Sequence, residues 1–277
     1  MKPRAVLTAG EAGELRAGSL RAGRDFQPAR REAVPKARRA GGVNQLLQSL
    51  PASDRRRVLA ACETVVLTRA EVIYSPGQQL RDVYFPVDGY ISLVMTVDEV
   101  ASLEVALIGN EGMLGVHLIL GVGVSPLRAV VQGAGFALRM RSADFLRELE
   151  RSSALHREIG RYACVRLAQL ARMSACTRFH LVQGRLARSL LMTQDRARTD
   201  TVHVTHELLA DMLGVRRVGI TKAARSLQKR GLIRYSRGDI TILDRPGLKA
   251  ASCGCYRADR ETYEGLLGYP RPDFLPG

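Results

Sequence analysis

The chain has 277 residues, a length that fits about two globular domains of roughly 100–150 residues each and excludes a mini-protein. Hydrophobic residues make up 46% of the chain and charged residues 25%, a composition that excludes a fibrous repeat or a wholly disordered chain. The longest apolar run, Met113 to Val124, falls short of the ~20 residues that a membrane-spanning helix needs, so we expect no membrane partner. Five cysteines, an odd number spread over about two hundred positions, argue against a secreted disulfide framework and favour a cytoplasmic location.

The net charge of +15 is unevenly distributed along the chain. Residues 178–260 carry 17 Lys and Arg against seven Asp and Glu, whereas residues 43–177 are close to neutral. A basic block beside a neutral one predicts that the C-terminal block contacts a polyanion, with a solvated basic surface as the alternative. Residues 1–42 lack an apolar period and are predicted to form a disordered basic tail. Residues 261–277 are expected to be a short C-terminal extension.

Residues 43–153 are predicted to form a β-rich domain. Two short helices open it on either side of Pro51, and seven short runs with strand character follow, separated by Gly, Pro and Asp. Runs that recur every 8–12 residues or so indicate an antiparallel sandwich or barrel. The predicted strands are Val65–Leu67, Val72–Tyr74, Val83–Phe85, Tyr90–Val97, Ser102–Ile108, Leu127–Gln132 and Phe136–Met140.

Helical character begins at Asp144, with Ser142 as the expected N-cap, and continues to about Arg178. The second part, residues 154–178, carries apolar residues at steps of three and four. Such a stripe packs either on its own domain or on a second copy of the chain, and we expect the second. The predicted dimerisation residues are Leu155, Ile159, Tyr162, Ala163, Leu167, Leu170 and Met173.

The basic block, residues 179–260, contains the most informative pattern. Within it, residues 202–243 predict a short strand, a helix from Thr205 to Leu213, a tight turn at Gly214, a helix from about Arg216 to Lys229, and a hairpin. Two helices joined by a glycine turn and followed by a hairpin indicate a winged helix-turn-helix.

The second of these helices has one apolar side and one cationic side. At about 100° per residue, Ile220, Ala223, Ala224 and Leu227 fall together on a side expected to be buried. Arg217 lies on the outward arc near the helix N-terminus, where it can donate to guanine in a major groove; a solvated cationic face is the alternative. The candidate DNA-binding residues are Arg216, Arg217, Val218, Thr221, Lys222, Arg225, Arg234 and Arg237.

From Asn44 to Leu243 the chain resembles the Crp/Fnr superfamily of bacterial transcription regulators, most specifically over residues 204–233. The resemblance implies an N-terminal cyclic-nucleotide-binding-like β-roll, a long dimerisation helix and a C-terminal winged helix-turn-helix. It also implies a homodimer that binds near-palindromic double-stranded DNA, with RNA polymerase as a candidate partner. Val218 occupies a place where the family commonly has an acidic residue, so we expect a different operator sequence.

The cyclic-nucleotide motifs of that family are altered here. The family's Gly-Glu-Leu turn corresponds to Gly112-Met113-Leu114, and Met113 cannot accept a hydrogen bond from a ribose. The family's phosphate-binding arginine corresponds to Arg128, which comes one place late, next to Ala129, and a one-residue slip turns a strand side chain to the opposite face. We therefore expect these five candidate pocket residues to bind another ligand, a partner or nothing, and not cyclic AMP.

No cofactor is expected from the remaining residues. Cys62, Cys164 and Cys176 stand isolated in the sequence and are predicted to serve packing, so an iron–sulfur cluster lacks its ligands. Cys253-Gly-Cys255 is a weak metal or redox motif, and no metal site is predicted from it. Phosphate-loop, zincin and hydrolase motifs are absent from the sequence, so we expect no enzyme. The sequence thus predicts an α+β DNA-binding regulator; the alternative is a dimeric signal-sensing scaffold that binds RNA or acidic protein.

Overall fold

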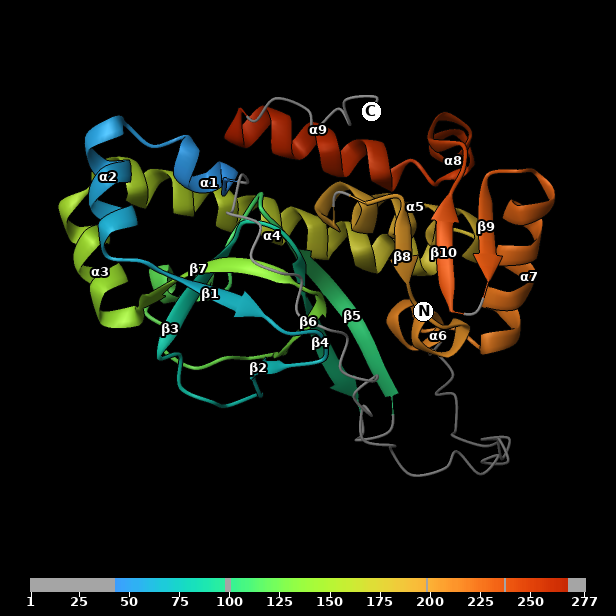
Figure 1. Cartoon of the computed structure of the whole chain (residues 1–277), viewed down its shortest axis with the longest axis horizontal. Coiled ribbons are helices and arrows are strands. Elements are labelled where there is room, and N and C mark those ends of the chain that lie inside the picture. The colour runs from blue at the N-terminus through green and yellow to red at the C-terminus, as the bar shows by residue number, and fades with distance from the viewer. Residues whose placement is uncertain (1–42, 98–100, 198, 237, 269–277) are drawn as a thin grey trace, which may run out of the picture.

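A computed structural model describes residues 43–97, 101–197, 199–236 and 238–268, and the predicted basic tail of residues 1–42 lies outside them. A β-rich domain, named the sensor domain after the role that the resemblance implies, a long helix and a winged helix domain follow one another along the chain (Figure 1). The predicted α+β class is confirmed. None of the helices within the described ranges is long and apolar enough to cross a bilayer.

The sensor domain opens with α1 (Gln45–Gln48) and α2 (Ala52–Ala60) and continues as a β-roll. All seven predicted runs form strands, with ends displaced by at most two residues. The strands are β1 (Glu63–Leu67), β2 (Val72–Tyr74), β3 (Asp82–Pro86), β4 (Tyr90–Val97), β5 (Ala101–Ile108), β6 (Arg128–Gly133) and β7 (Gly135–Arg141). They form two antiparallel sheets with the orders β1-β7-β3 and β2-β6-β4-β5. A short 3₁₀ helix, η1 (Val116–Leu120), lies between β5 and β6.

One apolar core holds the two sheets and the first helices together. Phe85, Ile91 and Met140 are almost fully buried in it. The turn between β3 and β4 depends on Gly89, which has a φ of +73° and whose Cβ, if present, would lie 2.5 Å from the carbonyl oxygen of Gly133. A side chain at this position would therefore push apart the turn and the end of β6.

The predicted helical segment divides into α3 (Ser142–Arg151) and α4 (Ser153–Phe179). Ser152 marks the division, since its hydroxyl accepts a hydrogen bond from the backbone N–H of Leu155 at 3.0 Å and donates to Asp54 at 2.8 Å. The prediction that Ser142 caps the first helix is wrong. Ser142 is the first residue of α3, and no side chain caps that helix.

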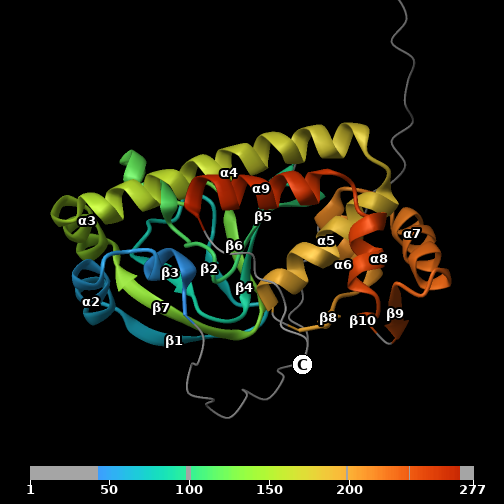
Figure 2. The ribbon, with the colours of Figure 1, turned by 90° about the horizontal axis from the view of Figure 1, so that it is seen from above.

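α4 has two apolar sides, and only one of them is buried within the chain. Leu155, Ile159 and Tyr162, predicted to mediate dimerisation, are fully buried in the sensor core. That part of the prediction is wrong, because Leu155 and Leu167 lie about 120° apart around the helix at 100° per residue and so face different neighbours. Leu167 and Leu170 are 65% and 38% exposed. Figure 2 shows the open side of α4 along one edge of the molecule.

The C-terminal domain is a winged helix-turn-helix, as predicted. Its elements are α5 (Val182–Ala197), β8 (Thr201–His203), α6 (His206–Leu213), α7 (Arg217–Lys229), β9 (Ile233–Ser236), β10 (Asp239–Ile242), α8 (Arg245–Ala251) and α9 (Cys255–Leu267). The three strands form a sheet in the order β8-β10-β9. A second core, which includes Leu190, Ile220 and Ile240, holds the helices against this sheet.

α9 joins the two domains. It runs beside α4 (Figure 2), with Tyr256 in the core of the winged helix domain and Leu267 in the core of the sensor domain. Asp259 is almost fully buried between them and pairs with Arg188 at 2.7 Å and with Arg172. The predicted domain boundary at residue 260 falls inside this helix.

Candidate nucleic-acid interface

Local sequence signals fix the helix-turn-helix. The hydroxyl of Thr205 accepts from the backbone N–H of Leu208 at 3.1 Å and so caps α6. Gly214 ends α6 in the left-handed conformation, with a φ of +60°. A Cβ at Gly214 would lie 3.1 Å from the side chain of Leu103 on β5. The turn is therefore packed against the sensor domain as well as shaped by its glycine.

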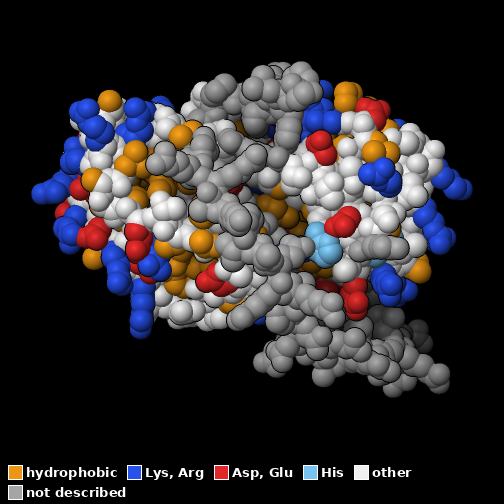
Figure 3. Space-filling model, viewed as in Figure 1, with side chains coloured by type: hydrophobic (Ala, Val, Ile, Leu, Met, Phe, Trp, Pro, Cys, Tyr) orange, Lys and Arg blue, Asp and Glu red, His pale blue; other side chains and the backbone are white. Residues whose placement is uncertain are grey.

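α7 exposes the cationic arc that the sequence predicts. Ile220, Ala223, Ala224 and Leu227 are buried, which confirms the predicted apolar side. The opposite side carries the exposed residues Arg217, Val218, Lys222 and Arg225. Figure 3 shows Lys and Arg side chains along the edge of the molecule where α7 and β9 lie. A helix with this profile fits a major groove about 12 Å wide.

Arg216 lies at the start of α7. The helical projection alone would put it on the buried side, but its place before the first turn favours a backbone or phosphate contact over a place in the core. In the structure it is the N-cap of α7, has extended backbone angles and is exposed. Its side chain makes no capping hydrogen bond, which leaves backbone N–H groups at the start of α7 available to a phosphate.

His206 was not identified from the sequence, yet it connects α6, α7 and the wing. Its ring stacks on Tyr235 of β9 with centroids 4.2 Å apart, and its Nδ1 lies 3.2 Å from the hydroxyl of Thr221. That hydroxyl also donates to the carbonyl of Arg217 at 3.1 Å, so Thr221 is held by contacts within the winged helix domain. Burial lowers the pKa of His206, and the positive charges of Arg217 and Arg225 lower it further.

The wing, β9 and β10, carries two of the candidate DNA-binding residues, of which the structure describes one. Arg234 is exposed on β9, opposite Thr241 of β10. Arg237 lies outside the described residues. Gly238 follows it with a φ of +90°, in keeping with a tight hairpin.

A buried ion pair joins the winged helix domain to the sensor domain. Arg196, at the end of α5, donates to Glu111 at 2.8 Å, and the two side chains are 6% and 13% exposed. Glu111 also accepts from the backbone N–H of Gly109 at 3.1 Å. Arg69 of the sensor domain adds a second connection by donating to the carbonyl of His203 at 2.6 Å. These contacts hold α5 and β8 of the winged helix domain against the β-roll.

Glu104 lies at the same contact between the two domains. We call this contact the seam and define it by Glu104, Glu111 and Arg196. It projects from β5 and is almost fully buried, and the hydroxyl of Ser92 donates to it. Burial raises the pKa of Glu104 to about 7, while the hydrogen bond from Ser92 and the charges of Arg196 and Arg188 act in the opposite direction. Glu104 is therefore a carboxyl group that ionises near neutral pH inside the seam.

This shift predicts a pH-dependent stability. Because the pKa of Glu104 in the folded state lies above the ordinary value of about 4.5, the stability that protonated Glu104 provides is present below about pH 4.5 and is lost as the pH rises through about 7. The full span is worth about 3 kcal/mol. We expect the Glu104→Gln variant to keep its stability as the pH rises. The difference between its free energy of unfolding and that of the wild type is therefore expected to grow between pH 5 and 8. Urea titrations of both proteins measure the difference, and parallel losses would contradict the assignment.

The predicted effector pocket is largely filled by the protein itself. Met113, Leu114 and Ala129 are buried, and a Cβ at Gly112 would lie 2.2 Å from the hydroxyl of Tyr162 on α4. A cavity of about 40 Å³ remains beside Met113, whereas small-molecule pockets take roughly 300–1,000 Å³. Arg128, at the start of β6 and half-buried, is not among the described residues that line this cavity.

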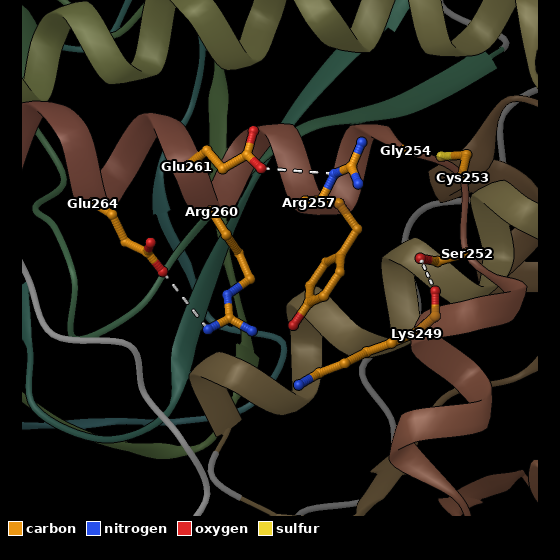
Figure 4. Close-up of a pocket in the computed structure, with 9 residues that line it drawn as sticks. Lys249, Ser252, Cys253, Gly254, Arg257, Arg260, Glu261 and Glu264 are labelled. Atoms are coloured by element: carbon orange, nitrogen blue, oxygen red, sulfur yellow. Dashed lines mark hydrogen bonds and ion pairs between the residues drawn. The ribbon is translucent and has the colours of Figure 1, made fainter.

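A larger pocket, of about 510 Å³, lies between α8 and α9 (Figure 4). Two arginines that line this pocket form ion pairs with glutamates one helical turn further along α9. Arg257 pairs with Glu261 at 3.6 Å, and Arg260 pairs with Glu264 at 3.9 Å. These pairs reduce its attraction for an anion. Cys253 lies at its end, beside the start of α9.

The prediction that Cys176 is isolated is wrong. Its Sγ lies 3.6 Å from the Sγ of Cys253, 77 residues away in the sequence. His180 and Cys255 complete a group whose potential ligand atoms all lie within 4.8 Å of one another. Such proximity depends on the packing of α9 along α4, which the sequence pattern did not predict.

Comparisons with known proteins agree with this architecture. A family model described as a Crp-like helix-turn-helix domain matches residues 184–251. This match runs from the first turn of α5 to the end of α8 and includes the cationic arc of α7. No curated protein sequence matches the chain.

Solved structures of Crp/Fnr-type regulators share the fold over most of the chain. A Crp/Fnr-family transcriptional regulator from Eubacterium rectale is 18% identical with a TM-score of 0.59, over 74% of this chain and 96% of that one. The c-di-GMP-responsive regulator CLP from Xanthomonas campestris is 18% identical with a TM-score of 0.57, over 69% and 99%. A CRP-family regulator from Thermus thermophilus is 20% identical with a TM-score of 0.55, over 68% and 96%. The chain therefore has the Crp/Fnr fold, with a Crp-like helix-turn-helix domain.

Proposed function

We propose that this chain, with a Crp-like helix-turn-helix domain on the Crp/Fnr fold, is a homodimeric regulator of transcription that binds a near-palindromic DNA site through α7. The observation that carries the proposal is the division of α7 into a buried apolar side and an exposed arc with Arg217, Lys222 and Arg225. Arg217, in the first turn of α7, is the candidate for a bidentate contact with guanine. Val218, 64% exposed, is suited to contact with a thymine methyl.

The homodimer is supported by the open side of α4. Gly160, Ala163, Leu167, Leu170 and Ser174 lie along it at alternating steps of four and three, the spacing of a two-stranded coiled coil. A second copy of the chain, related by a two-fold axis, would cover this side. Two α7 helices would then enter successive turns of the major groove, about 34–36 Å apart.

We propose that the sensor domain receives a signal other than a cyclic nucleotide. The cavity at the position that the resemblance assigns to the nucleotide measures about 40 Å³, too small for a nucleotide, and its lining combines Met113 and Leu114 with the polar side chain of Arg166. We propose that the β-roll transmits its signal through the seam formed by Glu111, Arg196 and Glu104. RNA polymerase is a candidate partner once the dimer is bound to DNA.

Two arginine substitutions test the proposed division between base and phosphate contacts. Arg217→Ala is expected to weaken binding to the preferred duplex by about 1–3 kcal/mol, or roughly 10–100-fold, with a much smaller effect on random duplex. Arg234→Ala, on the wing, is expected to weaken binding to both duplexes alike and to reduce the salt dependence. Fluorescence anisotropy titrations at several salt concentrations measure both effects. Equal losses on both duplexes for both variants would contradict the proposal.

The alternative function is a dimeric scaffold that binds RNA or acidic protein. A competition binding experiment distinguishes it from the proposed DNA-binding regulator. Double-stranded DNA, RNA of the same sequence and an acidic peptide are added at matched salt to the complex with labelled DNA. The proposal expects that only the preferred DNA duplex displaces the label at low concentration. Displacement by RNA at equal concentration would favour the scaffold.

A further inference from the structure

Four residues with metal-binding side chains meet where α4 ends. Cys176 lies in the last turn of α4 and His180 is the C-cap of that helix. Cys253 lies in the turn between α8 and α9, and Cys255 is the first residue of α9. Their Sγ and imidazole nitrogen atoms all lie within 4.8 Å of one another.

Two of the separations match those of ligands around one tetrahedral ion. The Sγ atoms of Cys176 and Cys253 are 3.6 Å apart, and the Sγ of Cys255 is 3.5 Å from Nδ1 of His180. Zinc bonds of about 2.3 Å to sulfur and about 2.0–2.1 Å to nitrogen would place two sulfurs about 3.8 Å apart and sulfur and nitrogen about 3.6 Å apart. A disulfide would instead require about 2.05 Å between sulfurs.

The surroundings suit a negatively charged metal centre. Three thiolates and one neutral imidazole give a zinc site a net charge of −1. Arg188 is positioned to act electrostatically on all three cysteines, and Arg185 on Cys176 and Cys253. Arg188 is itself held by Asp259 of α9. Such neighbouring charges and contacts stabilise and orient a metal site.

The same residues sit at the joint that carries the winged helix domain. α4 ends at Phe179 and α5 begins at Val182. The backbone N–H of Cys253 donates to the carbonyl of Gly184 in α5 at 3.2 Å, and a Cβ at Gly184 would lie 3.3 Å from the backbone nitrogen of Cys253. The α8–α9 turn is therefore packed closely on the joint. Cys253 also lines the pocket between α8 and α9 (Figure 4).

We propose that Cys176, His180, Cys253 and Cys255 bind one zinc ion, which fastens the end of α4 and the start of α5 to the turn between α8 and α9. Thiolate and imidazole ligands in a closed set of four select zinc and make the site structural, since they leave no open coordination position. The ligand atoms lie too close together to enclose a cluster of several irons. Zinc would thus hold the winged helix domain in its orientation on α4.

The test measures metal in the full-length chain, purified without a metal-affinity tag and dialysed against a weak chelator. Elemental analysis is expected to find about one zinc per chain. Replacement by Co²⁺ under reducing conditions is expected to give the visible absorption of tetrahedral cobalt and a thiolate-to-cobalt charge-transfer band. Absence of retained zinc together with absence of these bands would overturn the proposal, as would a Cys176–Cys253 disulfide in protein kept under reducing conditions.

His180 provides the matched variants, since it is exposed and its replacement leaves the cores intact. His180→Ala is expected to weaken zinc binding, measured by chelator competition, by roughly 10–100-fold or more, and His180→Cys is expected to restore most of it as a four-thiolate site. Cys62→Ala, which alters a cysteine of the sensor domain, is expected to bind zinc like the wild type. Equal zinc affinity in the wild type and His180→Ala would contradict the assigned ligand set.

Discussion

Leu167→Arg is expected to convert the proposed dimer into a monomer and to lower the affinity for the preferred DNA by at least about 100-fold. Leu167 is 65% exposed at the middle of the open side of α4, where a two-fold axis would bring it close to its own copy. Two arginines facing each other at a packed interface cost several kcal/mol through like-charge repulsion and desolvation, and a lone protomer keeps only one half-site.

Sedimentation velocity and anisotropy titrations measure the two consequences of Leu167→Arg. Leu59→Arg is the matched control, because Leu59 is 39% exposed on α2, away from this side. The control is expected to sediment and bind DNA like the wild type. A Leu167→Arg protein with the sedimentation coefficient of the wild type would contradict the assigned interface.

Glu111→Ala is expected to lower the free energy of unfolding by about 3–5 kcal/mol, because it leaves Arg196 buried without its partner. The guanidinium is 6% exposed and reaches Glu111 at 2.8 Å, so water has little access to replace the lost carboxylate. The substitution also removes the acceptor for the backbone N–H of Gly109. Loss of the seam is expected to precede loss of the sensor core, since the contact joins the two domains.

Glu63→Ala is the control for this loss. Glu63 accepts from Arg139 at 2.6 Å, but both side chains are partly open to solvent, and such exposed pairs are worth about 0–1 kcal/mol. Urea titrations followed by circular dichroism compare the two variants. Similar small losses in both would show that Arg196 reaches solvent when Glu111 is removed.

Local sequence patterns were sufficient to predict most of the fold and the cationic arc of α7. The strands follow from alternating apolar runs bounded by glycine and proline, and the buried side of α7 follows from the position of Ile220 and Leu227 at helical spacing. Thr205 and Gly214 mark the ends of α6 with ordinary capping chemistry. These features depend on neighbours within a few residues, which a sequence displays directly.

The failures concern contacts between distant segments. Leu155 and Leu167 look alike in the apolar pattern of α4, but one packs in the sensor core and the other is exposed, because the choice depends on what lies beside each. Cys176 and Cys253 come together only because α9 packs beside α4. His206 offered no signal, since its role arises from the stack on Tyr235.

Selection of bound duplexes from a random pool, carried out in parallel with the wild type and Arg217→Ala, tests the central claim most directly. For the wild type, the account predicts a near-palindrome whose half-site centres lie about one helical turn apart. For Arg217→Ala, it predicts the same motif with base preference lost at one symmetric position. Recovery of no motif by the wild type, or of an unchanged motif by the variant, would contradict the proposal that α7 reads the DNA sequence.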